Sequence, residues 1–247
     1  MSLQIAGIWR HPIKSHGREQ LEKVILTAGH AMPYDRLWAV VHDQSDADGS
    51  VWVPCLNFSR VTKAPELAAM TCRLDEQSGT ITLSHPMRDD LTVNPDTEGE
   101  ALVAWAGGLV PQGRASSARV IRGATGAFTD SDFQSVTLAN FASHRAVEQK
   151  LDRELSIHRW RANIWFDGGA PWEEFDWIGR EVALGEAVLR VVERTDRCLA
   201  THSNPDTGRR DLDILGTLDH WGHRDFSVRA EVIRGGRVAL GDEVTLP

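Results

Sequence analysis

Cys198 is the residue whose surroundings most clearly favour chemistry. It directly follows an expected strand and stands close to Arg194 and Arg197, ahead of a polar loop over residues 201–208. Cationic neighbours favour the thiolate form of a cysteine, which attacks electrophiles and binds soft metal ions. Cys198 is therefore a candidate nucleophile or metal ligand.

The other two cysteines differ from Cys198 in their surroundings. Cys55 and Cys72 lie within or beside apolar segments, so we expect inert roles in the core. Three cysteines without paired spacing make no disulfide framework, which predicts a reducing, cytoplasmic location. No Cys-x-x-Cys pair occurs, so the sequence supports neither a structural zinc site nor an iron–sulfur cluster.

Two short segments near the N-terminus could bind an anion. Pro12 favours an extended His11, which places Lys14 and Ser15 at the end of a strand, where an ammonium and a hydroxyl can contact a phosphate. Arg36 enters a segment that resembles a half-buried strand, where an arginine needs a carboxylate or phosphate partner. A solvated Lys14 and a simple salt bridge from Arg36 to Asp35 are the alternatives.

A third basic segment surrounds Trp160. If residues 160–166 form a strand, Arg159, Arg161 and Asn163 share one face and could hold an anion, although a solvated strand face would look the same. The pair His220 and His223 has no evident third ligand and is interpreted as polar surface or core. A Cys–His hydrolase built on Cys198 stays open, because no feature selects one of the ten histidines.

Composition excludes several classes of protein. The 247-residue chain has a formal net charge of −8, which argues against a nucleic-acid partner. No apolar run is long enough to cross a membrane, and residues 1–15 lack the apolar core of a signal peptide. Composition therefore argues against nucleic-acid and membrane partners.

Hydrophobic alternation predicts many short strands separated by turns. In the first half we expect strands over residues 3–9, 38–41, 51–53, 80–83 and 91–93, hairpin connections at 43–49 and 76–79, and a short helical piece within 56–67. In the second half we expect a helix from Thr137 to Leu151, a strand over 160–166, hairpins over 181–192 and 229–240, and a short helix over 212–218. The Gly- and Ser-rich segment 107–117 suggests a boundary between two modules, residues 1–110 and 111–247. The fold class is mainly β, in barrels or strongly curled sheets, with a few short helices.

Six motifs in register resemble the MOSC family, named for the C-terminal domain of molybdenum-cofactor sulfurase. The motifs are His11-Pro12-Ile13-Lys14-Ser15, Asp35-Arg36-Leu37-Trp38, Arg161-Ala162-Asn163-Ile164, Pro171-Trp172-Glu173-Glu174 with Trp177, Arg197-Cys198 with Pro205-Asp206-Thr207-Gly208, and Gly241-Asp242-Glu243-Val244. The resemblance spans nearly the whole chain and is nearest to the two-module type, which includes amidoxime-reducing proteins and bacterial reductases of N-hydroxylated bases. It implies a β-barrel-like MOSC domain with an N-terminal β-barrel module packed on it.

The resemblance also implies a cofactor, a ligand set and a reaction. Cys198 matches the cysteine that completes the coordination of molybdenum in a pyranopterin cofactor. The residues that match its binding set are Lys14, Ser15, Arg36, Arg161 and Asn163, with Arg197 beside the cysteine. Asp196 departs from the small polar residue often found at its position and is a candidate proton donor.

The function implied is an oxidoreductase that reduces N-hydroxylated compounds. Because the chain has no cluster motif, it would receive electrons from a separate ferredoxin-like or haem protein. A carrier that holds the cofactor or sulfur on Cys198 without turnover is the main alternative, and a β-rich scaffold that has lost the site is a third. The sequence leaves the substrate, the electron donor and the oligomeric state open.

Overall fold

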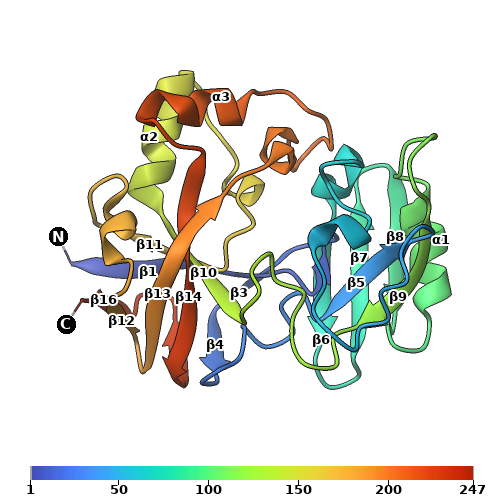
Figure 1. Ribbon diagram of the computed structural model, residues 1–247, viewed down its shortest axis with the longest axis horizontal. Helices are drawn as coiled ribbons and strands as arrows, with labels where there is room; N and C mark the ends of the chain where they lie inside the picture. The colour runs from blue at the N-terminus through green and yellow to red at the C-terminus, as the bar shows by residue number, and fades with distance from the viewer. Residues whose placement is uncertain (1, 247) are drawn as a thin grey trace.

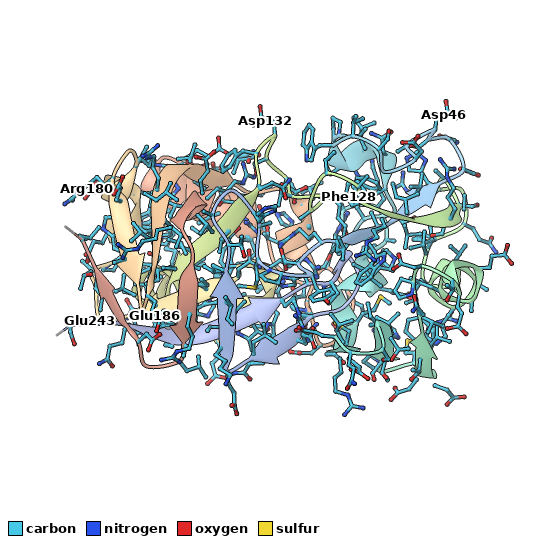
Figure 2. All side chains as sticks on the ribbon, turned by 90° about the horizontal axis from the view of Figure 1, so that it is seen from below. Asp46, Phe128, Asp132, Arg180, Glu186 and Glu243 are labelled. Carbon is cyan, nitrogen blue, oxygen red and sulfur yellow. The ribbon has the colours of Figure 1, made fainter. Side chains whose placement is uncertain are left out.

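A barrel and a smaller strand-rich body lie side by side along the long axis of the computed structural model, which describes residues 2–246 (Figure 1). Both ends of the chain lie at the far side of the barrel (Figure 1). In the perpendicular view, Asp46 marks the end of the smaller body, Arg180 and Glu243 mark the barrel end, and Asp132 lies between the two (Figure 2). The region between the bodies is where chain segments from both halves of the sequence meet.

Seven strands close the barrel in the order β11-β10-β14-β13-β12-β16-β1, with β1 pairing back to β11. These strands are β1 (Leu3–Arg10), β10 (Ser135–Asn140), β11 (Ile164–Asp167), β12 (Glu181–Leu184), β13 (Ala187–Asp196), β14 (Asp225–Arg234) and β16 (Glu243–Thr245). Closure pairs the edges that an open sheet would expose. Alternate apolar residues such as Val136, Leu138, Leu189 and Val191 fill the core.

Further strands from the beginning of the chain extend the sheet of the barrel or form a separate pair. β3 (Glu19–Leu21) pairs with β1, and β4 (Lys23–Leu26) pairs with β15 (Gly236–Ala239). The first strand of the sequence is thus held between β11 and β16, two strands of the second half. The boundary between the modules 1–110 and 111–247 stays a prediction. The outer ends of the two modules, Met1 and Pro247, lie outside the described residues.

The smaller body contains two three-stranded sheets and one helix. One sheet has the order β2 (Ile13–Lys14), β5 (Trp38–His42) and β9 (Ser117–Arg122); the other has the order β6 (Thr71–Asp75), β7 (Thr80–His85) and β8 (Arg88–Val93). The helix is α1 (Gly99–Gly107), which the sequence analysis missed. Trp38, Leu67, Ile81 and Leu102 belong to its core and are almost fully buried.

Short helices cover the barrel and connect its strands. α2 (Phe141–Leu151) and α3 (Ile214–Leu218) lie over one end of the barrel, above a core in which Trp160 stacks on Phe226 with ring centroids 3.7 Å apart (Figure 1). The 3-10 turns are η1 (Cys55–Asn57), η2 (Pro65–Ala69), η3 (Ile157–Arg159), η4 (Glu173–Trp177), η5 (Leu199–His202) and η6 (Asp219–Trp221). No helix in the described part of the chain is long and apolar enough to span a membrane.

Local signals predicted part of this arrangement correctly. The mainly β fold with few short helices is confirmed. So are the β12–β13 hairpin with its turn at Gly185, the turn between β6 and β7, and the short helix within residues 212–218. Each of these depends on residues close together in the sequence.

The helix expected from Thr137 begins four residues later. Residues 135–140 form β10, whose six side chains are all buried, and α2 begins only at Phe141. The side chain of Asn140 is the cap and accepts a hydrogen bond from the Ala142 N–H at 2.8 Å. The residue pattern of this short, fully buried segment does not distinguish a strand from a helix, and its pairing within the barrel makes it a strand.

The hairpin expected around Gly235 and Gly236 is wrong. β14 pairs with β10 and β13, whereas β15 pairs with β4. A Cβ on Gly235 would lie 2.7 Å from the Leu26 carbonyl oxygen, and one on Gly236 would lie 2.6 Å from the Glu186 backbone. The two glycines therefore permit close backbone packing rather than a two-residue turn.

Two further expectations in the first half are corrected. Residues 51–53 form no strand, so the segment 43–49 is a loop and not a hairpin connection, because β5 pairs with β2 and β9 instead. The helical piece within 56–67 is replaced by the separate 3-10 turns η1 and η2. The Trp52 indole donates a hydrogen bond to the Thr129 carbonyl at 2.9 Å, which fixes this loop against the segment that leads into the barrel.

Candidate functional site

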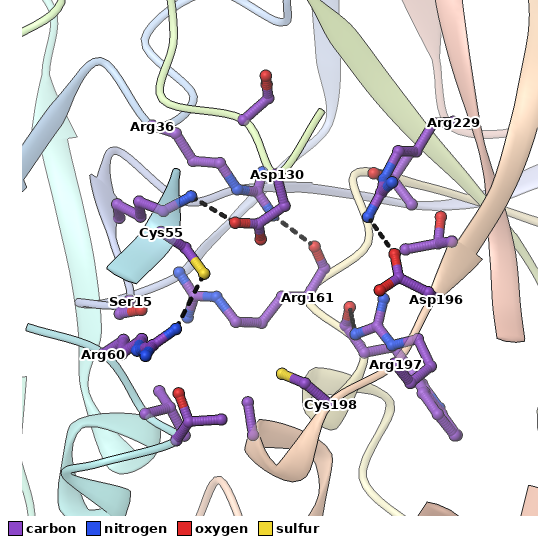
Figure 3. Close-up of a pocket in the computed structure, with 18 of the residues that line it drawn as sticks. Ser15, Arg36, Cys55, Arg60, Asp130, Arg161, Asp196, Arg197, Cys198 and Arg229 are labelled. Carbon is purple, nitrogen blue, oxygen red and sulfur yellow. Dashed lines mark hydrogen bonds and ion pairs between the residues drawn. The ribbon is translucent and has the colours of Figure 1, made fainter. Parts of the chain in front are cut away.

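A pocket of about 320 Å³ lies between the barrel and the smaller body (Figure 3). Segments from both bodies line it, and most of its polar side chains are cationic or hydroxylated. Its lining includes Lys14, Ser15, Arg36, Trp52, Cys55, Arg60, Thr129, Asp130, Arg159, Trp160, Arg161, Thr195, Asp196, Arg197, Cys198 and Arg229. Seven of the eight site residues predicted from the sequence are among them.

Lys14 lies at the end of β2, as expected, but it is buried rather than solvated. Its side chain is 4% exposed, and its ammonium donates hydrogen bonds to the Phe128 carbonyl at 2.7 Å and to Asp130 Oδ1 at 2.6 Å. Burial lowers the pKa of Lys14, although the Asp130 carboxylate opposes this shift. Lys14 therefore ties the loop that enters the barrel to the pocket wall and leaves a positive centre there.

Arg36 combines the structural and the anion-binding roles considered above. It forms a salt bridge with Asp35, and its Nη2 donates to the Arg161 carbonyl at 2.9 Å. Asp35 is fully buried and also accepts the backbone N–H of His11 at 2.7 Å. Burial alone would raise the pKa of Asp35, but Arg36 and His11 hold it well below its usual range. The guanidinium of Arg36 is thus held by a buried carboxylate while it lines the pocket.

Arg161 reaches the pocket from a turn and not from a strand face. Residues 157–159 are the turn η3 and Arg161 has a φ of 49°, so the strand expected over 160–166 begins only at Ile164, as β11. Burial and the nearby Arg36 lower the pKa of the Arg161 guanidinium to about 9. Its Nη1 donates to the Gly17 carbonyl at 3.3 Å, while its Nη2 has no partner.

Left-handed backbone recurs at three residues of the pocket. Ser15, Arg36 and Arg161 have φ values of 64°, 51° and 49°. This conformation costs a non-glycine residue roughly 1–2 kcal/mol. Strained residues of this kind cluster at binding and catalytic sites because the surrounding fold imposes them. These three side chains therefore owe their orientation to unusual backbone positions that no local pattern predicts.

Asn163 does not line the pocket. Its side chain is almost fully buried, accepts the Thr137 N–H at 3.1 Å and donates to the Trp9 carbonyl at 3.2 Å. It therefore links β10 to β1 inside the barrel wall. Among the predicted site residues, Asn163 alone has a purely structural set of contacts.

Cys198 lies just beyond β13, at the start of η5, and its side chain is exposed to the pocket. The hydroxyl and the N–H of Thr201 both donate to the Cys198 carbonyl, at 2.9 and 3.1 Å, which fixes the backbone of the loop. No hydrogen bond within residues 2–246 engages the Cys198 sulfur. The thiol is thus held in position but left free to bind.

The residues beside Cys198 have different environments. Arg197 Nη2 donates to the Trp160 carbonyl at 2.6 Å, and burial lowers the pKa of its guanidinium to about 10. Asp196 has an 82% exposed side chain and accepts a hydrogen bond from Arg229 at 3.0 Å. Asp196 is therefore a solvent-facing carboxylate at the rim, whereas Arg197 belongs to the wall.

The structure adds residues that the sequence analysis did not select for the site. Cys55, expected to be an inert core residue, is half-buried and faces the pocket, where its sulfur accepts a hydrogen bond from Arg60 Nη1 at 3.1 Å (Figure 3). Asp130 and Arg229 also line the pocket. Arg229 had a usable signal, because a charged residue in an otherwise apolar strand pattern needs a partner. Asp130 lies in a polar loop and had none.

Several buried polar atoms on the pocket lining have no hydrogen-bond partner. They are Arg159 Nε, Arg161 Nη2, Thr195 Oγ1 and Arg197 Nε. Buried polar groups in folded proteins are nearly always paired, so a group of unpaired donors beside one cavity indicates a surface prepared for a polar ligand. No three His, Cys, Asp or Glu side chains within the described chain gather into a metal-binding group.

Two domain families match this chain. The MOSC N-terminal beta barrel domain matches residues 2–107, and the MOSC domain matches residues 125–245. The two matches together cover nearly the whole sequence, and the chain belongs to the MOSC family.

Among curated proteins, the chain is similar to mitochondrial amidoxime-reducing component 1 of Mus musculus. The two are 25% identical over 248 residues, which cover 84% of this chain and 67% of the relative. The name of this relative describes a component that reduces amidoximes.

The solved structures to which this chain is similar include two bacterial proteins. The YUAD protein from Bacillus subtilis is 13% identical with a TM-score of 0.47, over 99% of this chain and 94% of that one. YiiM from Geobacillus stearothermophilus is 15% identical with a TM-score of 0.34, over 45% of this chain and 53% of that one.

Proposed function

We propose that the pocket binds a pyranopterin molybdenum cofactor, that Cys198 is the protein ligand of the metal, and that the protein reduces N-hydroxylated compounds. The observation that carries the proposal is the meeting of a free, exposed thiol with buried cations and unpartnered donors in one pocket. Membership of the MOSC family supports the cofactor, and the similarity to an amidoxime-reducing component supports the reaction.

The residues of the pocket fit the charge and the ligand preference of this group. The phosphate of a pyranopterin is anionic, and Lys14, Arg36 and Arg161 present three cations that would hold it, with the Ser15 hydroxyl beside them. The unpartnered Arg161 Nη2 and Thr195 Oγ1 would gain hydrogen bonds that the fold does not supply. A thiolate suits a metal already bound by sulfur, which is the role assigned to Cys198.

The reaction needs two electrons and two protons. When bound, the cofactor supplies a metal centre that exchanges two electrons and accepts oxygen. A substrate R–NHOH is then converted to R–NH2 and water, with electrons delivered by a separate ferredoxin-like or haem protein. Asp196, exposed at the rim and held by Arg229, would take protons from solvent and pass them to the substrate near Cys198.

The decisive experiment measures molybdenum and pterin in protein made in a host that synthesises the cofactor. We expect roughly one molybdenum per chain in the wild type, because one thiol and one cationic wall define one site. Cys198→Ser should lose most of the metal, and Cys72→Ser, whose thiol lies in β6, should retain it. Wild-type protein that carries no molybdenum when made in such a host would contradict the proposal.

Turnover then separates an enzyme from a carrier. Protein loaded with cofactor should reduce an amidoxime with reduced viologen dye as electron donor, and Cys198→Ser should not. Loaded protein without turnover, but able to transfer its cofactor to an apo-molybdoenzyme or carrying a persulfide on Cys198, would favour the carrier. Activity that survives the loss of Cys198 would contradict its assignment.

A further inference from the structure

A second hollow, of about 280 Å³, lies next to the pocket and shares one residue with it. Arg60 lines both cavities, and its guanidinium contacts Cys55 on the pocket side. Lys63 and Arg114 complete the basic part of the second hollow, and His42 and Leu56 contribute to its wall. The second hollow is therefore an extension of the candidate site and not a remote surface feature.

The charge of this hollow is opposite to that of the chain. The protein has a net charge of −8, yet the lining contains three cations and, among its described residues, no carboxylate. Within residues 2–246, neither Arg60 nor Lys63 nor Arg114 forms a salt bridge. Asp43, which follows His42 of the lining, accepts the Ser116 N–H at 3.2 Å, and Glu66, three residues after Lys63, forms no salt bridge within the described residues. Three uncompensated cations around one concave surface favour an anion.

The wall of the hollow is held in place before any ligand binds. His42 Nε2 contacts the Leu56 carbonyl at 2.7 Å, and the Ser59 N–H donates to the Val40 carbonyl of β5 at 2.8 Å. Phe58, beneath this segment, is 2% exposed, whereas Leu56 is 59% exposed at the lip. The hollow thus offers an apolar edge and a cationic end on a fixed backbone, which reduces the entropic cost of binding.

We propose that the second hollow binds a carboxylate or phosphate group carried by the substrate, which directs the N–O group towards Cys198. This inference rests on the proposed function and adds a substrate class to it: N-hydroxylated compounds with an anionic group at some distance from the nitrogen. Arg60 borders both cavities, so it positions the substrate between the anion subsite and the reacting end.

The test compares paired substrates on molybdenum-loaded protein with a viologen donor. Each pair consists of an aryl amidoxime with a terminal carboxylate on a linker and its neutral methyl ester, and the series varies the linker length. The wild type should prefer the acid over the ester in kcat/KM for at least one linker. In Lys63→Gln/Arg114→Gln this preference should fall about tenfold, since two charge–charge contacts are lost.

The matched control is Lys150→Gln/Arg153→Gln, which removes the same charges from exposed positions at the end of α2. This control should keep the wild-type preference. Inorganic phosphate tests whether a free anion can occupy the second hollow in place of the anionic group of the substrate. It should compete with the acid in the wild type and compete less in Lys63→Gln/Arg114→Gln.

The outcomes separate the two proposals. Turnover of the esters without any preference for an acid at any linker length would overturn the subsite and leave the proposed function standing. A preference that survives in Lys63→Gln/Arg114→Gln, or phosphate that inhibits acid and ester alike, would also overturn the subsite. No turnover of either member of any pair contradicts the proposed function, and the subsite with it.

Discussion

The buried polar groups around Glu174 and those of the pocket differ in how they are satisfied. Glu174, in η4, is fully buried, and its carboxylate accepts hydrogen bonds from Ser143 at 2.9 and 3.0 Å and from Asn140 at 3.0 Å. Arg161 and Thr195, on the pocket wall, each keep a buried polar atom without a partner. Both regions hold polar groups away from water, but only the first completes its hydrogen bonds within the chain.

This difference indicates the role of the Glu174 cluster and of the pocket wall. An unsatisfied buried donor costs roughly 1–3 kcal/mol, so a fold that retains several of them has forgone stability at that place. The Glu174 cluster fixes the turn η4 to β10 and α2 and needs no ligand. The pocket wall, in contrast, completes its hydrogen bonds only when a polar ligand binds. Substitutions in the first region should therefore change stability, and those in the second should change ligand retention.

The largest effect is expected from the ionisation of Glu174. Burial raises the pKa of this carboxyl to about 7, although hydrogen bonds from the backbone, Asn140 and Ser143 oppose the shift. A raised folded-state pKa gives stability that is complete below the unfolded pKa, near 4.5, and is lost as the pH rises through 7. Between these two pH values the free energy of unfolding of the wild type should fall by about 3 kcal/mol. Glu174→Gln cannot ionise, so its free energy of unfolding should not show this fall.

Denaturant unfolding of both proteins between pH 4.5 and pH 8 measures this difference. The free energy of unfolding of Glu174→Gln should rise relative to the wild type as the pH increases. Glu243→Gln, at an exposed position in β16, is the control and should follow the wild-type profile. Parallel pH profiles for the wild type and Glu174→Gln would show that the cluster does not hold its proton.

A smaller effect, on ligand retention, is expected at Arg161. Arg161→Ala removes a charged donor from the proposed phosphate site, which should weaken cofactor retention by about 1.5–3 kcal/mol, or ten- to a hundredfold. The free energy of unfolding of the cofactor-free protein should stay within about 1 kcal/mol of the wild-type value, because Nη2 has no partner to lose and Nη1 loses only a long hydrogen bond, 3.3 Å to the Gly17 carbonyl. Molybdenum content after dialysis and denaturant unfolding report the two quantities.

Arg190→Ala is the matched control for Arg161→Ala. Arg190 forms an exposed salt bridge with Glu181 on the far side of the barrel, with side chains 51% and 47% exposed. The Arg190→Ala protein should keep the wild-type molybdenum content. Unchanged molybdenum retention in Arg161→Ala would contradict the assignment of this arginine to the cofactor-binding wall.

The smallest effect is expected at Thr195. Thr195→Val replaces an unpaired buried hydroxyl with a methyl group of similar shape, so the cofactor-free protein should be equally stable or up to about 1 kcal/mol more stable. Thr201→Val is the contrast, because the Thr201 hydroxyl donates to the Cys198 carbonyl at 2.9 Å and its loss should cost about 1 kcal/mol. Equal destabilisation by both substitutions, measured by thermal unfolding, would contradict the distinction between the two regions.

The sequence by itself determined the features that depend on neighbouring residues. Period-2 alternation gave the mainly β fold, and the turn at Gly185, with its φ of 55°, gave the β12–β13 hairpin. The sequence also indicated the chemistry of the site, because Cys198 and its arginine neighbours lie close together in the chain. Lys14, Ser15, Arg36 and Arg161 could be selected by their types and by the family resemblance, and all four line the pocket.

Only the tertiary structure decided how these residues meet. Closure of the barrel by β1 against β11, the pairing of β15 with β4, and the meeting of Cys55 and Asp130 with Cys198 join segments far apart in the sequence. Such contacts depend on the summed packing of the whole chain, which no local pattern contains. The left-handed backbone at Ser15, Arg36 and Arg161 opposes local preference and persists because the surrounding fold imposes it. For the same reason Asn163, chosen by its place in a motif, turned inward to join β10 and β1.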